Sequence, residues 1–203
     1  MNSPVTKLIT TLLQDKKENL NIPLKSCNKI FFRTVLLCMA NTLYIVRHAQ
    51  AERANGAQAD EFRRLTAAGE RTARQLGEFL RSTNSNVNLI ISSPAVRALT
   101  TAQRMMESLA LSPAPIMQLE HTLYSGSWQS ILKRLTSLPE SFSHVMLVGQ
   151  YPTLVELHDY LSANRQLGMM QPGELSALSF SGPWCELSEA TATHQLTYHP
   201  VLA

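Results

Sequence analysis

Residues 42–48 read TLYIVRH, a short apolar run that ends abruptly in the charged pair Arg47 and His48. β-Branched and aromatic side chains favour strands, and an unbroken apolar run of this length is typical of a strand buried on both faces. Residues 88–92 (NLIIS) and 145–148 (VMLV) have the same character. The sequence therefore predicts three buried strands, and polar residues follow each of them.

Helical patterns separate these strands. Thr66 can accept a hydrogen bond as the cap of a helix that runs to about Arg81. Further helices are expected over residues 95–109, 128–138 and 152–161, and two last strands over residues 175–180 and 195–198. Strands that alternate with helices favour a mostly parallel sheet covered on both faces. We therefore expect an α/β protein with a three-layer α/β/α sandwich.

The first 38 residues differ in charge from the rest of the chain. They hold six basic and two acidic residues, whereas residues 39–203 carry a small negative net charge. We interpret residues 1–38 as an N-terminal extension, either disordered or upstream of a start at Met39, and residues 39–203 as one domain. Because the positive charge belongs to the extension, no basic face remains to follow a polynucleotide, and nucleic-acid binding is not expected.

Three further features bear on location and partners. No uncharged apolar run approaches the roughly 18 residues of a membrane-spanning helix, and charged residues occupy the middle of the extension, where a secretory signal needs an apolar core. The three cysteines are odd in number and lack metal-ligand spacing. We therefore expect a cytoplasmic monomer with no membrane association and no bound metal.

Polar side chains gather where the predicted strands end. Arg47 and His48 follow the first strand, Arg97 lies one turn into the helix after the second, and Gln150 comes just after the third. Ligand sites in parallel sheets lie beyond the carboxyl ends of the strands. An arginine beside a buried strand is costly unless an anion meets it, and guanidinium groups match the geometry of phosphate oxygens. The sequence therefore predicts a phosphate site at this edge.

Taken together, these segments resemble the histidine phosphatase superfamily, and specifically its small SixA-type phosphohistidine phosphatases. The resemblance covers nearly all of residues 39–203 and implies the phosphoglycerate mutase-like fold. It rests on five segments in the family's order, namely LYIVRHAQAE (43–52), RLTAAGERTARQLGEFL (64–80), LIISSPAVRALTTAQ (89–103), VMLVGQYPTL (145–154) and MMQPGELSALSF (169–180).

The resemblance implies that His48 attacks phosphorus and carries a covalent phosphoryl group, which water later removes. Arg47 and Arg97 would hold the phosphoryl oxygens, and no metal or other cofactor would be needed. The family has a second histidine where this chain has Gln150. The Gln150 amide can donate to the phosphate only as a neutral group, which predicts turnover slowed roughly 5- to 150-fold. Glu120 is a candidate general acid, although an ordinary exposed carboxylate is the simpler interpretation.

The implied function is hydrolysis of phosphohistidine on a partner protein, as in signal transduction, through a phospho-His48 intermediate. Two alternatives stay open. Gln150 is also consistent with a weak or inactive module that binds phosphate or a phosphorylated protein without turnover. The same residues also suit a phosphomonoesterase that acts on small molecules.

Overall fold

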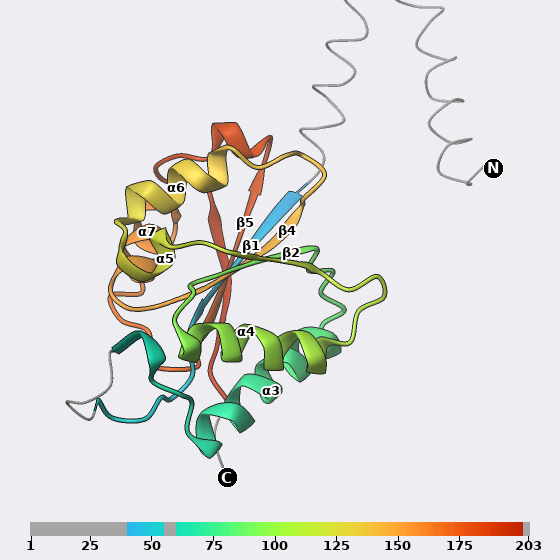
Figure 1. Ribbon diagram of the computed structural model, residues 1–203. Coiled ribbons are helices and arrows are strands. Elements are labelled where there is room, and N and C mark those ends of the chain that lie inside the picture. The colour runs from blue at the N-terminus through green and yellow to red at the C-terminus, as the bar shows by residue number, and fades with distance from the viewer. Residues whose placement is uncertain (1–39, 55–59, 201–203) are drawn as a thin grey trace, which may run out of the picture. The chain divides into compact units, whose positions relative to one another are not determined.

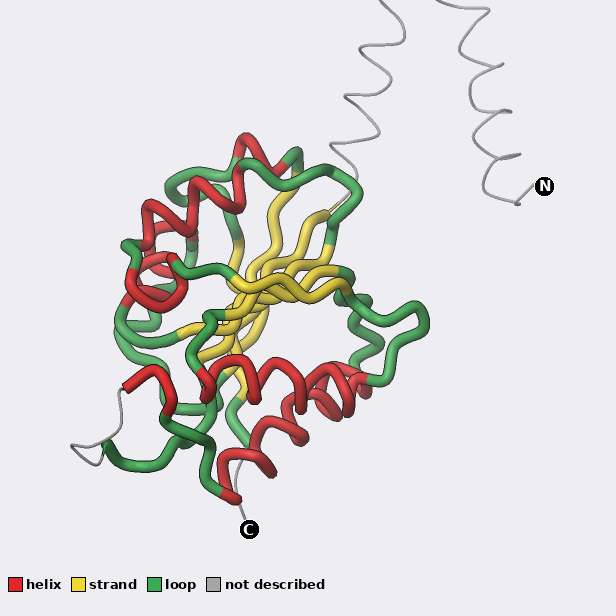
Figure 2. The backbone as a smooth tube through the Cα atoms, in the orientation of Figure 1, coloured by secondary structure: helices red, strands yellow, loops and turns green. Residues whose placement is uncertain are grey.

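A computed structural model describes residues 40–54 and 60–200, whose backbone Figures 1 and 2 show. Its centre is a six-stranded sheet with the order β3-β2-β4-β1-β5-β6. The first four strands in this order run parallel, and β5 and β6 are antiparallel to their neighbours. The strands are β1 (Ala40–Arg47), β2 (Leu89–Ser92), β3 (Ile116–Leu119), β4 (His144–Gly149), β5 (Leu175–Ser181) and β6 (Thr193–Tyr198).

Helices cover both faces of this sheet. On one face lie α3 (Ala67–Ser82) and α4 (Val96–Leu109), and on the other lie α5 (Thr122–Ser125), α6 (Trp128–Thr136) and α7 (Thr153–Leu161), as Figure 1 shows. Two short 3₁₀ turns, η1 (Asp60–Phe62) and η2 (Trp184–Glu186), lie in the connections. The predicted three-layer α/β/α sandwich is confirmed.

The alternation of side chains along β1 explains why both faces need helices. Leu43 and Ile45 are fully buried in the cluster that contains the apolar side chains of α6 and α7. Tyr44 and Val46 are buried in the second cluster, with the side chains of α3 and α4. Successive residues of a strand point to opposite faces, so an unbroken apolar run requires a hydrophobic layer on each side.

The start of α3 agrees with the sequence, whereas the segment between α4 and α6 does not. Thr66 is the cap of α3 and accepts a hydrogen bond from the Gly69 amide at 3.0 Å. The strand β3 and the short helix α5 were not predicted, because residues 116–125 carry neither a long apolar run nor a helical period. The interpretation of residues 1–38 lies outside the described residues. Within the described ranges, no helix is long and apolar enough to cross a membrane.

The loop that follows β1 is held from two sides, and this fixes the position of His48. The Gly173 amide donates to the carbonyls of Arg47 and His48, at 3.2 and 3.0 Å. Gly173 has a φ of +79°, and a Cβ added there would overlap the methyl group of Thr72. A residue with a side chain is therefore strained at this position. The segment before β5 thus holds the end of β1 in place through Gly173.

Candidate active site

His48 lies at the carboxyl end of β1 and is 8% exposed. Its backbone amide continues the pairing of β1 with β4 by donating to the Gly149 carbonyl at 2.9 Å. The ring atom Nδ1 lies 2.8 Å from the carbonyl of Ala49. A carbonyl can only accept, so Nδ1 carries the proton and Nε2 keeps its lone pair. In agreement, Nε of Arg97 donates to His48 Nε2 at 3.2 Å.

The surroundings of His48 keep its imidazole neutral. Burial lowers the pKa of His48 to about 4, and the positive charges of Arg97, Arg47 and Arg63 act in the same direction. The hydrogen bond to Ala49 opposes this shift only in part. At pH 7 the ring is therefore uncharged, with an unprotonated Nε2, which is the form that acts as a nucleophile.

Arg97, in the first turn of α4, is 2% exposed although it is a cation. Besides His48, it donates to two residues. Its Nη1 donates to the Asp60 carbonyl at 2.6 Å, and its Nη2 donates both to Asp60 Oδ2 and to Gln150 Oε1 at 2.7 Å. These bonds use four of the five N–H groups of a guanidinium. The structure therefore brings Arg97, His48 and Gln150 together, as the sequence predicted.

Arg47, the last residue of β1, is less completely satisfied. Its Nη1 donates to the Met170 carbonyl, and its guanidinium carbon lies 5.5 Å from the centre of the Tyr151 ring. Its Nε is buried and has no hydrogen-bond partner among the described residues. A buried donor without a partner is costly, and a bound oxyanion would supply the acceptor that this atom lacks.

Gln150 differs from its predicted arrangement. We expected its amide to donate to a bound phosphate, but its Nε2 donates to the Tyr124 carbonyl at 2.6 Å, and its Oε1 accepts from Arg97. The physical reason is that Arg97 can only donate and the Tyr124 carbonyl can only accept, so the two neighbours fix the orientation of the carboxamide. In this structure, Gln150 therefore presents an acceptor to the cluster, where a donor was predicted.

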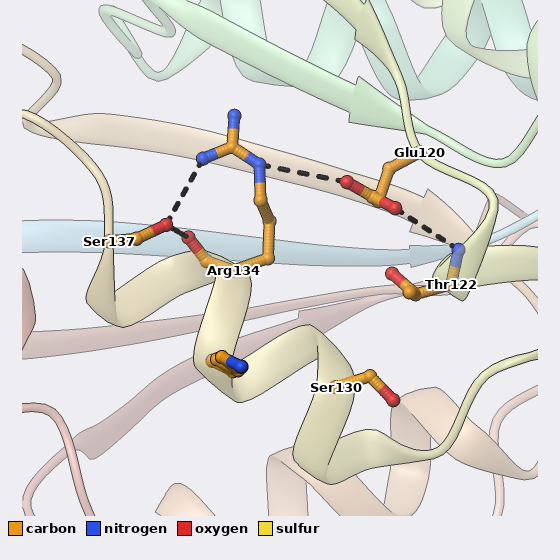
Figure 3. Close-up of a pocket in the computed structure, with 6 residues that line it drawn as sticks. Glu120, Thr122, Ser130, Arg134 and Ser137 are labelled. Carbon is orange, nitrogen blue, oxygen red and sulfur yellow. Dashed lines mark hydrogen bonds and ion pairs between the residues drawn. The ribbon is translucent and has the colours of Figure 1, made fainter.

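Glu120 follows the end of β3, and its side chain contacts residues of α5 and α6. Figure 3 shows its carboxylate between the Thr122 amide, which donates to Oε1 at 3.2 Å, and Arg134, whose Nε lies 3.7 Å from Oε2. These residues line a pocket of about 330 Å³ together with Ser130, Lys133 and Ser137. The structure therefore does not bring Glu120 to His48, where a general acid would be needed.

Two residues of the cluster were missed by the sequence analysis. Asp60, in η1, binds Arg97, and its Oδ1 lies 3.0 Å from Nε of Arg63. Partial burial raises the pKa of the Asp60 carboxyl, but the hydrogen bond and charge of Arg97 and the charge of Arg63 lower it below its usual value. Asp60 is thus ionised at neutral pH. The spacing of three between Asp60 and Arg63 was the available signal, but it is common on protein surfaces.

The chemistry of the cluster is that of an anion site beside a nucleophile. Three guanidinium groups are close enough to His48 to lower its pKa, whereas Asp60 acts on Arg97 and Arg63, and Glu174 acts on Arg47. The combination leaves a positive excess next to an unprotonated imidazole nitrogen. Among residues 40–54 and 60–200, no three His, Cys, Asp or Glu side chains are grouped so that they could hold a metal ion.

Comparisons with known proteins agree with this arrangement. Residues 43–137 match the sequence profile of the histidine phosphatase superfamily (branch 1). A structure assigned as the phosphohistidine phosphatase SixA of Nakamurella multipartitia is similar, with a TM-score of 0.70 and 28% identity over 80% of this chain and 98% of the other. No curated protein matches the sequence significantly.

Two further solved structures share the fold. The protein histidine phosphatase SixA complexed with tungstate has a TM-score of 0.68 and 18% identity, over 78% of this chain and 96% of the other. A structure assigned as SixA of Agrobacterium tumefaciens has a TM-score of 0.66 and 20% identity, over 79% and 98%. The profile match ends at residue 137 and does not include Gln150.

The titration of His48 tests the electrostatics of the site. NMR of the imidazole Cε1–H group should give a midpoint near pH 4, and the signal should be absent in His48→Ala. The ring is then neutral above that pH, so the nucleophile is present throughout the range from 5 to 8. Arg97→Gln should raise the midpoint, because it removes a nearby positive charge. A wild-type midpoint at the ordinary histidine value of about 6.5 would contradict this description.

Proposed function

Because residues 43–137 belong to the histidine phosphatase superfamily, we propose that the protein hydrolyses phosphohistidine on a partner protein, through a phosphoryl group carried on Nε2 of His48. The observation that carries the proposal is the state of His48. Its Nδ1 proton is held by a carbonyl, its unprotonated Nε2 carries the lone pair that would attack, and the buried cation Arg97 donates to that nitrogen in the absence of substrate.

In the first step, the His48 Nε2 lone pair attacks phosphorus. The bond between phosphorus and the substrate imidazole breaks, and its electron pair stays on the departing nitrogen. Arg97 and the unpartnered Nε of Arg47 offer positive charge and donors to the phosphoryl oxygens. In a loose transition state the charge is spread over these oxygens, so fixed cations contribute mainly by electrostatic stabilisation.

In the second step, water attacks the phosphoryl group on His48, and its protons leave with the inorganic phosphate. The hydrogen bond from Nδ1 to Ala49 keeps a proton on the ring, so the imidazole ring of phospho-His48 is a cation. When the bond from phosphorus to Nε2 breaks, the electron pair neutralises this cation, and neutral imidazole is the leaving group. The step therefore regenerates the starting tautomer without a separate acid.

The surface around the site supports a protein substrate. Tyr151 is 46% exposed and packs against Arg47, and Met169 is 60% exposed and adjoins Met170, whose carbonyl binds the same arginine. Aromatic and methionine side chains are enriched at protein interfaces. A macromolecular partner would cover these side chains while its phosphohistidine enters the site.

Transfer of label tests the covalent intermediate. The wild-type protein, mixed with a phosphotransfer domain labelled with ³²P on histidine and quenched within one turnover, should carry label that is lost in acid and retained in alkali. His48→Ala should carry none. His121→Ala is the matched control, because His121 is exposed at the start of α5, and it should carry label like the wild type.

Binding of the phosphorylated domain without transfer of label would replace this proposal with a module that only binds. Label on His48 with comparable kcat/KM on phosphohistidine and on sugar phosphates would favour a phosphomonoesterase for small molecules.

Substitution of Gln150 tests how this position limits turnover. Gln150→His should raise kcat about tenfold, since an imidazole N–H can donate to the phosphoryl oxygens where the Gln150 oxygen only accepts. Gln150→Glu has the same shape but places a second carboxylate on Arg97, and it should lower kcat/KM. Single-turnover kinetics on the phosphotransfer domain measures both. Equal rates in wild type and Gln150→His would show that the site no longer uses a donor here.

A further inference from the structure

Asp60 is hydrogen-bonded to the guanidinium group of Arg97, on which the proposed function depends. Its carbonyl and its Oδ2 both accept from the terminal nitrogens of Arg97, at 2.6 and 2.7 Å. The two side chains differ in exposure, since that of Arg97 is 3% exposed and that of Asp60 is 51% exposed. An incoming anion can therefore displace the exposed Asp60 carboxylate, while the buried Arg97 side chain stays in place.

Two contacts keep Asp60 near the site after such a displacement. Its backbone carbonyl accepts from Nη1 of Arg97, and this bond does not involve the carboxylate. Its Oδ1 is paired with Nε of Arg63 at 3.0 Å, and Arg63 is in turn tied to the Glu52 carbonyl at 3.2 Å. The carboxylate can therefore exchange Arg97 for another partner while it stays at the entrance to the site.

The position of Asp60 relative to His48 indicates which group of the substrate the Asp60 carboxylate would contact. Arg97 donates to His48 through Nε and to Asp60 through its terminal nitrogens, so the nucleophile and the carboxylate contact different nitrogens of one planar group. In a displacement at phosphorus, the attacking and leaving atoms are roughly in line. A phosphoryl group held along Arg97 with His48 behind it thus has its leaving group toward Asp60.

We propose that Asp60 determines leaving-group specificity, because its carboxylate accepts a hydrogen bond from the protonated imidazole of phosphohistidine and disfavours leaving groups that have no N–H to donate. This inference rests on the proposed function and names the feature of the substrate that the site selects.

The proposed transfer starts from a protonated substrate ring. The substrate ring carries the phosphoryl group on one nitrogen and a proton on the other, so it is a cation, and Asp60 pairs with that N–H. His48 Nε2 forms the new bond to phosphorus as the old bond from phosphorus to nitrogen breaks. The released electron pair neutralises the ring, which leaves as imidazole with its proton in place. Asp60 stays ionised throughout and favours the protonated substrate ring by charge.

A phosphate ester meets the opposite situation at the same position. Its bridging oxygen has lone pairs and no proton, and negative charge develops on it as the bond to phosphorus breaks. A carboxylate beside that oxygen raises the energy of the transition state. The same residue therefore favours cleavage of a phosphorus–nitrogen bond and opposes cleavage of a phosphorus–oxygen bond.

Asp60→Asn tests this role, because asparagine keeps an oxygen that can accept from Arg97 but lacks the charge. On a histidine-phosphorylated phosphotransfer domain, kcat/KM should fall about tenfold or more, whereas on p-nitrophenyl phosphate it should rise. The decline of kcat/KM on phosphohistidine at alkaline pH should also begin at lower pH than in the wild type, since the substrate ring loses the carboxylate that favours its protonation.

Equilibrium binding of tungstate gives a readout that does not need turnover. Asp60→Asn should bind tungstate about tenfold more tightly, since the internal anion that competes for Arg97 has lost its charge. Glu61→Gln is the matched control, because it removes a neighbouring charge, and it should change neither the substrate ratio nor the affinity.

The outcomes separate the two proposals. If the wild type neither turns over phosphohistidine nor forms phospho-His48, the proposed function fails, and the tungstate measurement still tests the competition. If the wild type is active but Asp60→Asn changes kcat/KM for both substrates by the same factor, the specificity role is overturned and the function stands. Unchanged tungstate affinity overturns the displacement of Asp60 from Arg97.

Discussion

A buried guanidinium against an unprotonated imidazole nitrogen is the interaction on which the rest of this site depends. Arg97 is 2% exposed, and a cation at that depth is strongly unfavourable unless each of its donors finds an acceptor. His48, Asp60 and Gln150 supply those acceptors. The need to satisfy Arg97 therefore explains the tautomer of His48, the orientation of the Gln150 amide and the position of the Asp60 carboxylate.

The sheet order explains how residues far apart in sequence reach this guanidinium. β1 lies between β4 and β5, and β2 pairs with the other edge of β4. The ends of β1, β2 and β4 thus meet at one edge, where His48, the start of α4 and Gln150 follow in turn. Gly173 holds the end of β1 from the β5 side through its amide. The parallel strands therefore position the residues of the site, and the segment before antiparallel β5 holds the end of β1 in place.

The sequence was sufficient for the parts that follow from periodicity. Buried strands are recognisable as apolar runs, so Arg47, His48, Arg97 and Gln150 could be assigned to one edge before their contacts were known. The contacts of Asp60 could not be predicted, because it lies in an irregular segment where no period fixes which way a side chain points. The orientation of Gln150 was also inaccessible, since the Tyr124 carbonyl that sets it comes from a helix that the sequence did not predict.

The most direct test of the central claim is the position of the proton on His48. Long-range ¹H–¹⁵N NMR spectra of the imidazole, recorded near pH 7 and assigned with His48→Ala, distinguish the two tautomers. We expect the proton on Nδ1 and an unprotonated Nε2 whose ¹⁵N signal shifts when tungstate is added. A proton on Nε2 would contradict the account, because Arg97 could not then donate to that atom and His48 would have no lone pair directed at the anion site.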